Sequence, residues 1–354
     1  MNILLTGGTG NVGRTTVKRL VDNGHTVRVI GRRSGITIEG AEYVVCDVTD
    51  YDALRDQARG MDGIVHLAAI PWPGGAPGQE IFDINCRGTF NVYQAAAEQG
   101  IHKISCASSI NALGFNYGIV PFEIQYFPID EAHPTYTTDP YSFSKQVMEE
   151  IADYYWRREG ISSVSLRLPG VYEVGGRRMA HMAQFTARFR QAIGELLARP
   201  EAERRERVRR AVAKFDAIRP QFSQPVSREE MIARWRAHRD DPDLLLLRGG
   251  FGRSDFWASI DARDAAQALE KGLLADYEGS HPLFVNDREN AAGIESETLI
   301  QLFYPEVTAR KRPLRGADTL VSIDKARALI GYEPEYPLCA LIESIQAEQD
   351  TPKE

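Results

Sequence analysis

The sequence predicts an α/β protein whose parallel sheet carries helices on both faces. From residue 2 to about residue 170, short apolar runs alternate with stretches of helical periodicity. A glycine follows each of the clearest expected helices, where a helix commonly ends. Strands that alternate with helices form βαβ units, and these units build a doubly wound parallel sheet whose ligands sit at the carboxyl ends of the strands.

The elements of this sheet can be placed in chain order. Helices are expected over residues 12–23, ended by Gly24, and over residues 82–99, ended by Gly100. Strands are expected at residues 3–5, 27–30, 43–45, 63–67, 103–107 and 163–168.

Residues 177–240 differ in character and are expected to form two or three helices. Apolar side chains recur there at helical spacing, and Ser227 begins a capping box that Glu230 completes. We interpret the region as a helical insertion rather than an independent domain. Its arginines are expected to form a solvated face; the alternative is a lid, or a surface that grips an anionic substrate or a partner chain. They crowd together at Arg204, Arg205, Arg207, Arg209 and Arg210.

The alternation of strands and helices returns in the last third of the chain. The expected elements there are a strand at residues 244–247, a helix over residues 265–274 capped by Asp264, a strand at residues 283–286, and a helix that begins near Ser322 and ends at Gly331. The predicted organisation is a first domain over residues 1–170 and a smaller part over residues 171–354, some of whose segments return to the first sheet.

Composition excludes several classes of protein. A net charge of −7 gives no reason to expect nucleic acid or an anionic membrane as partner. No apolar run approaches the roughly 20 residues that span a bilayer, and residues 2–5 read as a strand rather than as part of a signal peptide. The four cysteines are Cys46, Cys86, Cys106 and Cys339. They lack the clustering of a disulfide framework or a metal site. We therefore expect reduced, mostly buried thiols, no bound metal and a cytoplasmic protein.

A glycine-rich turn at the start of the chain predicts a dinucleotide site. Gly7, Gly10 and Gly13 follow the first strand and open the first helix, which is the context that a dinucleotide fingerprint requires. Glycine permits the tight turn and the close approach of the backbone to a pyrophosphate, which then meets the helix N–H groups and the positive end of the helix dipole. Asn11 and Val12 complete the turn and are expected to contact the cofactor.

The end of the second strand favours NADP over NAD. An acidic residue there would hold the ribose hydroxyls and disfavour a 2′-phosphate. The chain instead has Gly31 followed by Arg32 and Arg33, and a guanidinium pairs with phosphate through its planar fork. NADP is therefore the expected cofactor, and NAD with solvated arginines is the alternative. Asp47 and Val48, after the third strand, are expected at the adenine edge.

Tyr141 and Lys145 predict a site of proton transfer. They stand four residues apart on an expected helix and so share one face, and Asp139 and Pro140 supply an N-cap and an N1 proline just before them. An unperturbed tyrosine has a pKa near about 10 and is a poor base at neutral pH. A neighbouring lysine ammonium, together with the charge of an oxidised nicotinamide, would lower the pKa of Tyr141 toward the working range.

With these motifs the chain resembles the extended short-chain dehydrogenases/reductases, a family that holds sugar epimerases, dehydratases and dehydrogenases. The resemblance runs through nearly the whole chain: TGGTGNVG from Thr6, HLAA from His66, DINCRGTFNV around Asn85, ASSINALG from Ala107, YSFSK from Tyr141 and LRLPGVY from Leu166. It implies a Rossmann-type doubly wound sheet with a smaller C-terminal substrate-binding part.

The resemblance also implies roles for individual residues. Ser109 would hydrogen-bond the reacting oxygen of the substrate, Tyr141 would take or give its proton, and Lys145 would tune Tyr141 and hold the nicotinamide ribose. Ser108 is the alternative to Ser109 if the register shifts by one residue. The cofactor would further be lined by Leu67, Ala68, Ala69, Asn85 and Pro169.

The same resemblance implies a homodimer. Members of the family usually pair through the helix that carries the tyrosine and lysine and through its neighbour. The apolar and aromatic residues of this helix that suit such an interface are Val147, Ile151, Tyr154 and Tyr155.

Departures from the family's sequence patterns narrow the range of reactions expected of this chain. Dehydratases usually carry Thr-Asp-Glu at the position of Ser109 and the two residues after it, and many UDP-sugar epimerases have asparagine at the position of Gly170. Residues 62–117 look closest to uronate dehydrogenases. The sequence therefore predicts an NAD(P)-dependent oxidoreductase that acts at a hydroxyl or ketone carbon of a small sugar or sugar derivative. The alternatives are a nucleotide-sugar epimerase with tightly bound NAD and a non-catalytic redox sensor.

Other residues are candidate contacts of this substrate or of the cofactor loop. Arg178, Arg253 and Trp257 are candidates, with an ordinary surface or core position as the alternative for each. His133, in the loop before Tyr141, is a further candidate. His66 is expected to pack against the cofactor loop.

Overall fold

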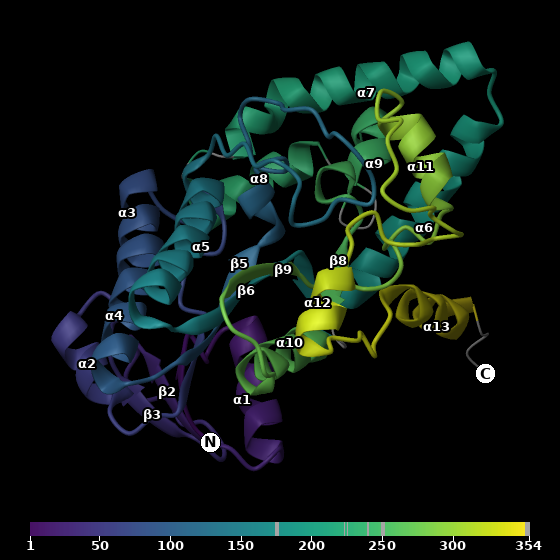
Figure 1. Cartoon of the computed structure of the whole chain (residues 1–354). Coiled ribbons are helices and arrows are strands. Elements are labelled where there is room, and N and C mark those ends of the chain that lie inside the picture. The colour runs from purple at the N-terminus through teal and green to yellow at the C-terminus, as the bar shows by residue number, and fades with distance from the viewer. Residues whose placement is uncertain (174–176, 223, 225, 239–240, 249–251, 351–354) are drawn as a thin grey trace.

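The centre of the molecule is a seven-stranded sheet in which every strand pairing is parallel (Figure 1). The computed structural model describes residues 1–173, 177–222, 224, 226–238, 241–248 and 252–350. The strands are β1 (Asn2–Thr6), β2 (Thr26–Gly31), β3 (Glu42–Val45), β4 (Gly63–His66), β5 (Lys103–Ser109), β6 (Ser162–Leu168) and β9 (Ser280–Phe284). Their order in the sheet is β3-β2-β1-β4-β5-β6-β9. All six strands predicted for the first half are present, and β9 overlaps the strand expected at residues 283–286.

Helices cover both faces of this sheet, which confirms the predicted doubly wound fold. They are α1 (Asn11–Asp22), α2 (Tyr51–Ala58), α4 (Gly88–Gln99), α5 (Pro140–Glu159) and α10 (Ala262–Leu274). α1 packs against α10, while α2, α4 and α5 form the opposite layer (Figure 1). Successive strand residues point to opposite faces, so Ile3 and Leu5 join the core of α1 and α10 and Leu4 joins the core of α4 and α5.

The helix predicted over residues 82–99 is divided in two. α3 (Gly78–Phe82) runs into a π-helical turn at Asp83–Arg87, and α4 begins at Gly88. π-Helical turns are rare overall, but those that occur are frequently found at functional sites. This one carries Asn85. Gly100 ends α4 in the left-handed region, as the sequence predicted.

The second half of the chain is mainly helical. Its two short strands, β7 (Gly170–Tyr172) and β8 (Ser259–Asp261), pair in parallel as a separate sheet. Its helices are α6 (Arg177–Leu197), α7 (Glu201–Phe222), α8 (Arg228–Ala237), α9 (Pro242–Arg248), α11 (Ser296–Phe303), α12 (Asp324–Ile330) and α13 (Leu338–Asp350). α6, α7 and α8 lie in the predicted insertion, and α12 is the helix expected near Ser322. Ser227 Oγ accepts a hydrogen bond from Glu230 N at 3.1 Å, as the capping box predicted.

The prediction of a strand at residues 244–247 is wrong, because this segment lies in the helix α9. Asp241 Oδ1 accepts hydrogen bonds from Asp243 N at 3.0 Å and from Leu244 N at 3.2 Å, which caps the helix start. Consecutive leucines fit a buried helix as well as a buried strand, and leucine favours helix. Leu246 and Leu247 are buried in the core that α9 shares with α7.

Asp264 is not the cap of α10. The helix begins at Ala262, and its cap is Asp261, whose Oδ1 accepts from Arg263 N at 2.8 Å. Asp264 instead accepts hydrogen bonds from the backbone N–H groups of Glu335 and Tyr336, at 2.9 and 3.1 Å. Two aspartates three residues apart can each begin a helix, so the sequence could not choose between them.

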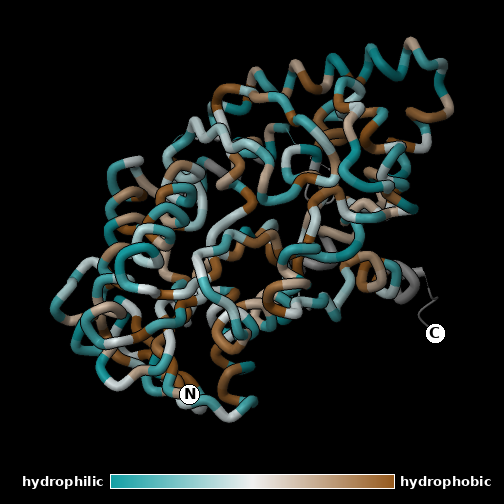
Figure 2. Tube along the Cα trace, in the orientation of Figure 1, coloured by the Kyte–Doolittle hydropathy of each residue, from teal (hydrophilic) through white to brown (hydrophobic). Residues whose placement is uncertain are grey.

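The insertion shares a hydrophobic core with the rest of the second half. Phe189 of α6 and Val208 of α7 belong to the same cluster as Phe115, Phe256 and Tyr304. Figure 2 shows hydrophobic segments inside both halves of the molecule and a largely hydrophilic outer surface on α7. Within the described ranges, no helix is long and apolar enough to cross a bilayer.

Most of the clustered arginines on α7 form surface ion pairs, as expected of a solvated face. Arg209 pairs with Glu206 at 2.8 Å and Arg210 with Asp243 at 2.9 Å, and all three of Arg205, Arg209 and Arg210 have exposed side chains. Exposed pairs of this kind contribute little to stability, typically less than about 1 kcal/mol.

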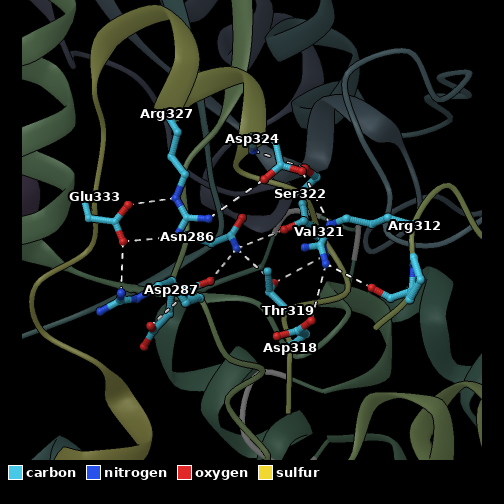
Figure 3. Close-up of polar contacts among 12 residues, drawn as sticks. Asn286, Asp287, Arg312, Asp318, Thr319, Val321, Ser322, Asp324, Arg327 and Glu333 are labelled. Carbon is cyan, nitrogen blue, oxygen red and sulfur yellow. Dashed lines mark hydrogen bonds and ion pairs between the residues drawn. The ribbon is translucent and has the colours of Figure 1, made fainter. Parts of the chain in front are cut away.

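Polar contacts fix the chain that follows β9 (Figure 3). Asn286 Nδ2 donates to Thr319 Oγ1 at 3.0 Å and to Val321 O at 3.2 Å. Arg327 on α12 pairs with Glu333 at 2.8 Å. The C-terminal segments are thereby held against the end of the last strand of the sheet.

Candidate active site

The turn between β1 and α1 is shaped by close backbone contacts. Gly7 has a φ of +75°, and a Cβ on it would lie 2.8 Å from Ala68 N. A Cβ on Gly13 would lie 2.4 Å from Gly7 O, and Gly10 N–H donates to the same oxygen at 3.1 Å. No side chain caps α1 at its N-cap, Gly10. The turn thus has the tight backbone and uncapped helix start that fit a pyrophosphate.

The residues predicted to bind the adenosine half lie after β2 and β3. Arg32 and Arg33 are exposed, and neither guanidinium has an ion pair with a described acidic residue. Tyr43 donates to Arg33 O at 2.8 Å, which fixes the backbone there. Asp47 Oδ1 accepts from Thr49 N at 2.9 Å. Val48 is buried beside α4.

Asn11 stands at the first turn of α1, where the sequence placed a cofactor contact. With its amide nitrogen turned toward Glu173, Asn11 donates to Glu173 Oε2 at 2.7 Å. Glu173 follows β7, so this contact brings the second half of the chain to the glycine-rich turn. Val12 lies partly buried against the core of α1 and α10.

A chain of buried hydrogen bonds starts at Thr6, the last residue of β1. Thr6 Oγ1 accepts from Leu67 N at 3.1 Å and from Ala68 N at 3.0 Å, and it lies 2.8 Å from His66 Nδ1. His66 Nε2 lies 3.1 Å from Thr89 Oγ1. Burial, with a smaller effect of Lys145, lowers the pKa of His66 to about 3, so the imidazole is neutral. His66 therefore packs against Thr6, the residue that precedes the glycine-rich turn, as expected.

The chain continues to the helix that carries Tyr141. Thr89 Oγ1 donates to Asn85 O at 2.5 Å, and Asn85 Nδ2 donates to Ser144 Oγ at 2.9 Å. Ser144 Oγ donates in turn to Tyr141 O at 2.7 Å. Asn85 has no exposed surface, and Ile70 N and O take up its remaining hydrogen-bonding capacity. In the structure Asn85 is held by Ile70 after β4 and by Ser144 on α5; its contact with the cofactor stays a prediction.

The two adjacent serines at the end of β5 point to opposite sides. Ser108 Oγ donates to Glu149 Oε1 at 2.6 Å, beneath α5. Ser109 Oγ accepts from Asn111 N and from Asn111 Nδ2, each at 3.1 Å, and it hydrogen-bonds Tyr141. Ser109 is thus the serine that faces Tyr141.

Tyr141 and Lys145 converge on the end of β5. Tyr141 lies in the first turn of α5, whose cap Asp139 accepts from Ser142 N at 2.9 Å. Lys145 Nζ donates to Ala107 O at 2.8 Å and lies 5.9 Å from the centre of the Tyr141 ring. All three predicted catalytic side chains are nearly buried, with exposures of 5% for Tyr141, 5% for Ser109 and 3% for Lys145.

The electrostatics of Tyr141 differ from the expectation. Burial raises the pKa of Tyr141 to about 12; the hydrogen bond from Ser109 opposes this shift, and the charges of Asp139 and Asp255 add to it. Burial also lowers the pKa of Lys145. In the protein alone, desolvation of the phenolate therefore outweighs any help from the ammonium.

Two residues near Tyr141 were missed by the sequence analysis. The ring of Tyr117 meets that of Tyr141 edge-on, with centroids 5.9 Å apart. Asp255 precedes Phe256 and Trp257, which both have positive φ, and burial raises the pKa of its carboxyl to about 7. Left-handed conformations are uncommon for such residues and concentrate at functional sites. No motif marks either residue, because they approach Tyr141 only through the tertiary fold.

The other predicted substrate contacts have structural partners. Trp257 is fully buried, and Arg253 lies over the Tyr304 ring at 4.5 Å and donates to Phe303 O at 3.1 Å. His133 is buried, and its Nε2 accepts from Gln125 N at 3.0 Å. The remaining predicted positions are Ala69, partly exposed after β4, Pro169, buried after β6, and Arg178, whose side chain lies outside the described residues.

Comparison with known proteins identifies the family. Residues 3–208 match the NAD dependent epimerase/dehydratase family, and the chain belongs to it. One relative is an L-arabinose 1-dehydrogenase (NAD(P)(+)) of Haloferax volcanii, 36% identical over 172 residues, which cover 47% of this chain and 65% of that protein. Another is a uronate dehydrogenase of Pseudomonas syringae pv. tomato, 31% identical over 180 residues, which cover 50% of this chain and 62% of that protein. The chain thus spans less than two thirds of these curated relatives.

A solved structure shows the same fold. It is a short-chain dehydrogenase/reductase superfamily protein from Agrobacterium tumefaciens with bound NAD, and it superposes with a TM-score of 0.64 at 22% identity. The alignment covers 99% of this chain and 97% of that chain. The predicted Rossmann-type architecture of the extended short-chain dehydrogenases/reductases is confirmed.

Proposed function

We propose that the protein is a nicotinamide-dependent oxidoreductase that acts at a hydroxyl or ketone carbon of a sugar or sugar derivative. The observation that carries the proposal is the convergence of Ser109, Tyr141 and Lys145 at the carboxyl end of β5. β1 of the same sheet ends in a glycine turn that fits a pyrophosphate. Ligands of doubly wound sheets bind at this edge.

In this proposal Tyr141 Oη takes the proton of the substrate hydroxyl during oxidation and returns it during reduction. Ser109 Oγ already accepts two hydrogen bonds from Asn111, so its own proton is directed to Tyr141 or to the substrate oxygen. Lys145, anchored on Ala107 O, keeps two N–H groups for ribose hydroxyls. A bound nicotinamide would supply the hydride acceptor or donor, and the protein orients it.

NADP is the proposed cofactor, with NAD as the alternative. Arg32 and Arg33 support NADP, since both guanidiniums are exposed at the end of β2 and Gly31 stands where an acidic residue would select NAD. A relative named for use of NAD(P)(+) is consistent with either nucleotide.

A free sugar or sugar acid is the proposed class of substrate. Two relatives are named as dehydrogenases of arabinose and of uronate, and these names support a carbohydrate. The family also includes epimerases by its description, so an epimerase that retains its nucleotide is the second candidate. Tyr141 and Lys145 are both present and buried together, which argues against a sensor without catalysis.

The first experiment identifies the nucleotide and the reaction together. Freshly purified protein is denatured, released nucleotide is identified by mass spectrometry, and protein without nucleotide is titrated with NADP and NAD. A panel of aldoses and uronates is then tested for reduction of either nucleotide. The proposal expects nucleotide-free protein, tighter binding of NADP and sugar-dependent NADPH formation. Stoichiometric NAD retained through purification would instead support the epimerase.

Replacing both Arg32 and Arg33 with alanine is expected to weaken NADP binding by at least about 10- to 100-fold, because the loss of even one hydrogen bond between charged groups costs roughly 1.5–3 kcal/mol. Binding of NAD should change by less than about twofold. Arg59→Ala, an exposed arginine near the end of α2, is the matched control. Equal affinity of the double variant and the native protein for NADP would contradict the assignment.

We also propose a homodimer. Phe82, Phe90, Phe143 and Tyr154 are exposed by 38–47% on α3, α4 and α5, and they stack in pairs across these helices. Tyr155, which the sequence placed in the interface, is instead fully buried in its own protomer. Light scattering at micromolar concentration should give the mass of two chains, and Phe143→Glu should give that of one.

A cytoplasmic location is supported by the cysteines. All four are free thiols and buried, as predicted: Cys46, Cys86, Cys106 and Cys339. Burial raises the pKa of Cys46 to about 11 and that of Cys106 to about 12, so these thiols stay protonated and unreactive. Free buried thiols are typical of proteins in reducing compartments.

A further inference from the structure

One arginine of the insertion leaves the solvated face and enters the loop beside the candidate active site. Arg219, near the end of α7, is 3% exposed. Its Nη1 donates to Phe115 O at 3.1 Å and to Gly118 O at 3.3 Å, and its Nη2 donates to Asp216 Oδ1 at 2.7 Å. The guanidinium also lies over the Phe115 ring at 5.8 Å. α7 therefore holds residues 115–118 through hydrogen bonds from a buried charge.

This loop is in turn locked to the segment that leads into α5. Gly114 has a φ of +93°, and a Cβ on it would lie 2.1 Å from Tyr136 O. Tyr136 N donates to Leu113 O at 2.9 Å, and Val120 N donates to Thr138 Oγ1 at 3.2 Å. Thr138 immediately precedes the cap of α5. Any displacement of the loop would therefore reach the first turn of the helix, where Tyr141 lies.

Two further contacts complete the link. Gln146 on α5 accepts from Thr137 Oγ1 at 2.8 Å and donates to Thr135 Oγ1 at 2.9 Å. Tyr117, in the middle of the loop, presents its ring edge-on to Tyr141. The loop thus meets both the backbone that precedes Tyr141 and the ring of Tyr141 itself.

We propose that Arg219 is a positioning residue for Tyr141. By fixing residues 115–118, it sets Tyr117 and residues 135–138 so that the phenol stays beside Ser109. The inference rests on the proposed role of Tyr141 in proton transfer. Arg219 stands on α7, within the insertion and after residue 208, where the match to the family model ends. The insertion is therefore part of the catalytic architecture.

The direct test is hydrogen exchange of the nucleotide-free protein, which needs no activity. In Arg219→Met, amides of residues 113–120 and 135–138 should exchange about 10- to 100-fold faster, because the lost hydrogen bonds are to a charged group. Arg209→Met is the matched control, since Arg209 stands on the same helix and forms only a surface pair with Glu206. It should leave exchange in both segments unchanged.

A catalytic readout distinguishes positioning from general stability. Arg219→Met should lower kcat for the sugar by about 10-fold while the Kd of the nucleotide, measured by fluorescence titration, stays within about twofold. Arg219→Lys keeps the charge but loses the planar fork, which binds the two carbonyls through Nη1 and Asp216 through Nη2. This variant should therefore fold normally and give intermediate exchange and kcat.

Unchanged exchange in residues 113–120 for both Arg219 variants would overturn the inference. So would faster exchange with an unaltered kcat, because the loop would then be held without consequence for Tyr141. If Tyr141→Phe kept full activity while the exchange result held, the proposed function would fail and the contact between α7 and the loop would stand on its own.

Discussion

Replacing Tyr141 with phenylalanine is expected to lower kcat by about 10²- to 10⁴-fold, the range that a positioned acid or base contributes. Nucleotide affinity should be unchanged, because the ring and its contacts with Tyr117 and Ile81 remain. Folding stability should fall by only about 1 kcal/mol, since one neutral hydrogen bond to Ser109 is lost.

The pH dependence of oxidation gives a second readout of the same variant. Burial holds the pKa of Tyr141 far above neutrality in the protein alone, so the active phenolate gains population as pH rises. The native rate should therefore increase with pH until the pKa of the complex is reached, and the variant should lose this increase. Tyr154→Phe on the exposed side of α5 is the control. A Tyr141 variant with native kcat and a native pH profile would eliminate the proposed mechanism.

Replacing Glu149 with leucine is expected to destabilise the protein by about 3–5 kcal/mol, the usual result of leaving a buried charge without its partner. Arg167 Nη2 lies 2.8 Å from Glu149 Oε2 and its Nε lies 3.0 Å from Oε1, with side-chain exposures of 5% and 10%. Ser108 would lose its acceptor as well. The pair joins α5 to β6, and Glu149, four residues after Lys145, also joins α5 to Ser108 of β5.

Urea unfolding of the variant and of two companions would test this expectation. Glu150→Leu changes an exposed neighbour and should alter the free energy of unfolding by less than about 1 kcal/mol. The double variant Glu149→Leu with Arg167→Met removes both charges and should recover much of the loss. A double variant no more stable than the single one would show that the pair is not the source of the effect.

The sequence was sufficient to predict the strands of the sheet, because the signals that mark a strand or the end of a helix are local. Each strand is a short apolar run, and Gly100 and Gly331 end their helices in the left-handed conformation that glycine favours. The segment at residues 244–247 shows the limit of such signals. Its leucines fit either element, and the cap at Asp241 with packing against α7 decided for a helix.

The candidate site was predictable only in part. The glycine turn and the pair Tyr141 and Lys145 have fixed spacing, so a pattern could mark them. Alternation along β5 requires the side chains of Ser108 and Ser109 to point to opposite faces of the sheet. Only the position of Glu149 shows that Ser108 is the one that lies beneath α5. The opposing effects on the pKa of Tyr141 also depend on burial, which spacing alone does not give.

Arg219 and Asp255 carry no local signal. Arg219 is one of many arginines in a polar helix, and its burial depends on a loop about a hundred residues earlier in the chain. Asp255 approaches Tyr141 through a turn of two aromatic residues in the left-handed region, which sequence propensity disfavours. Contacts of this kind arise from tertiary packing and need a structure.

The core around Phe115 has a consequence for the order in which the molecule is assembled during synthesis. It joins Phe115 to Phe189, Phe256 and Tyr304, which are spread over more than half of the chain. Chains emerge from the ribosome N-terminus first, so six of the seven sheet strands are available long before this core can close. The nascent protein is thus expected to form its glycine-rich turn early and the core around Phe115, which lies in the loop beside Tyr141, last.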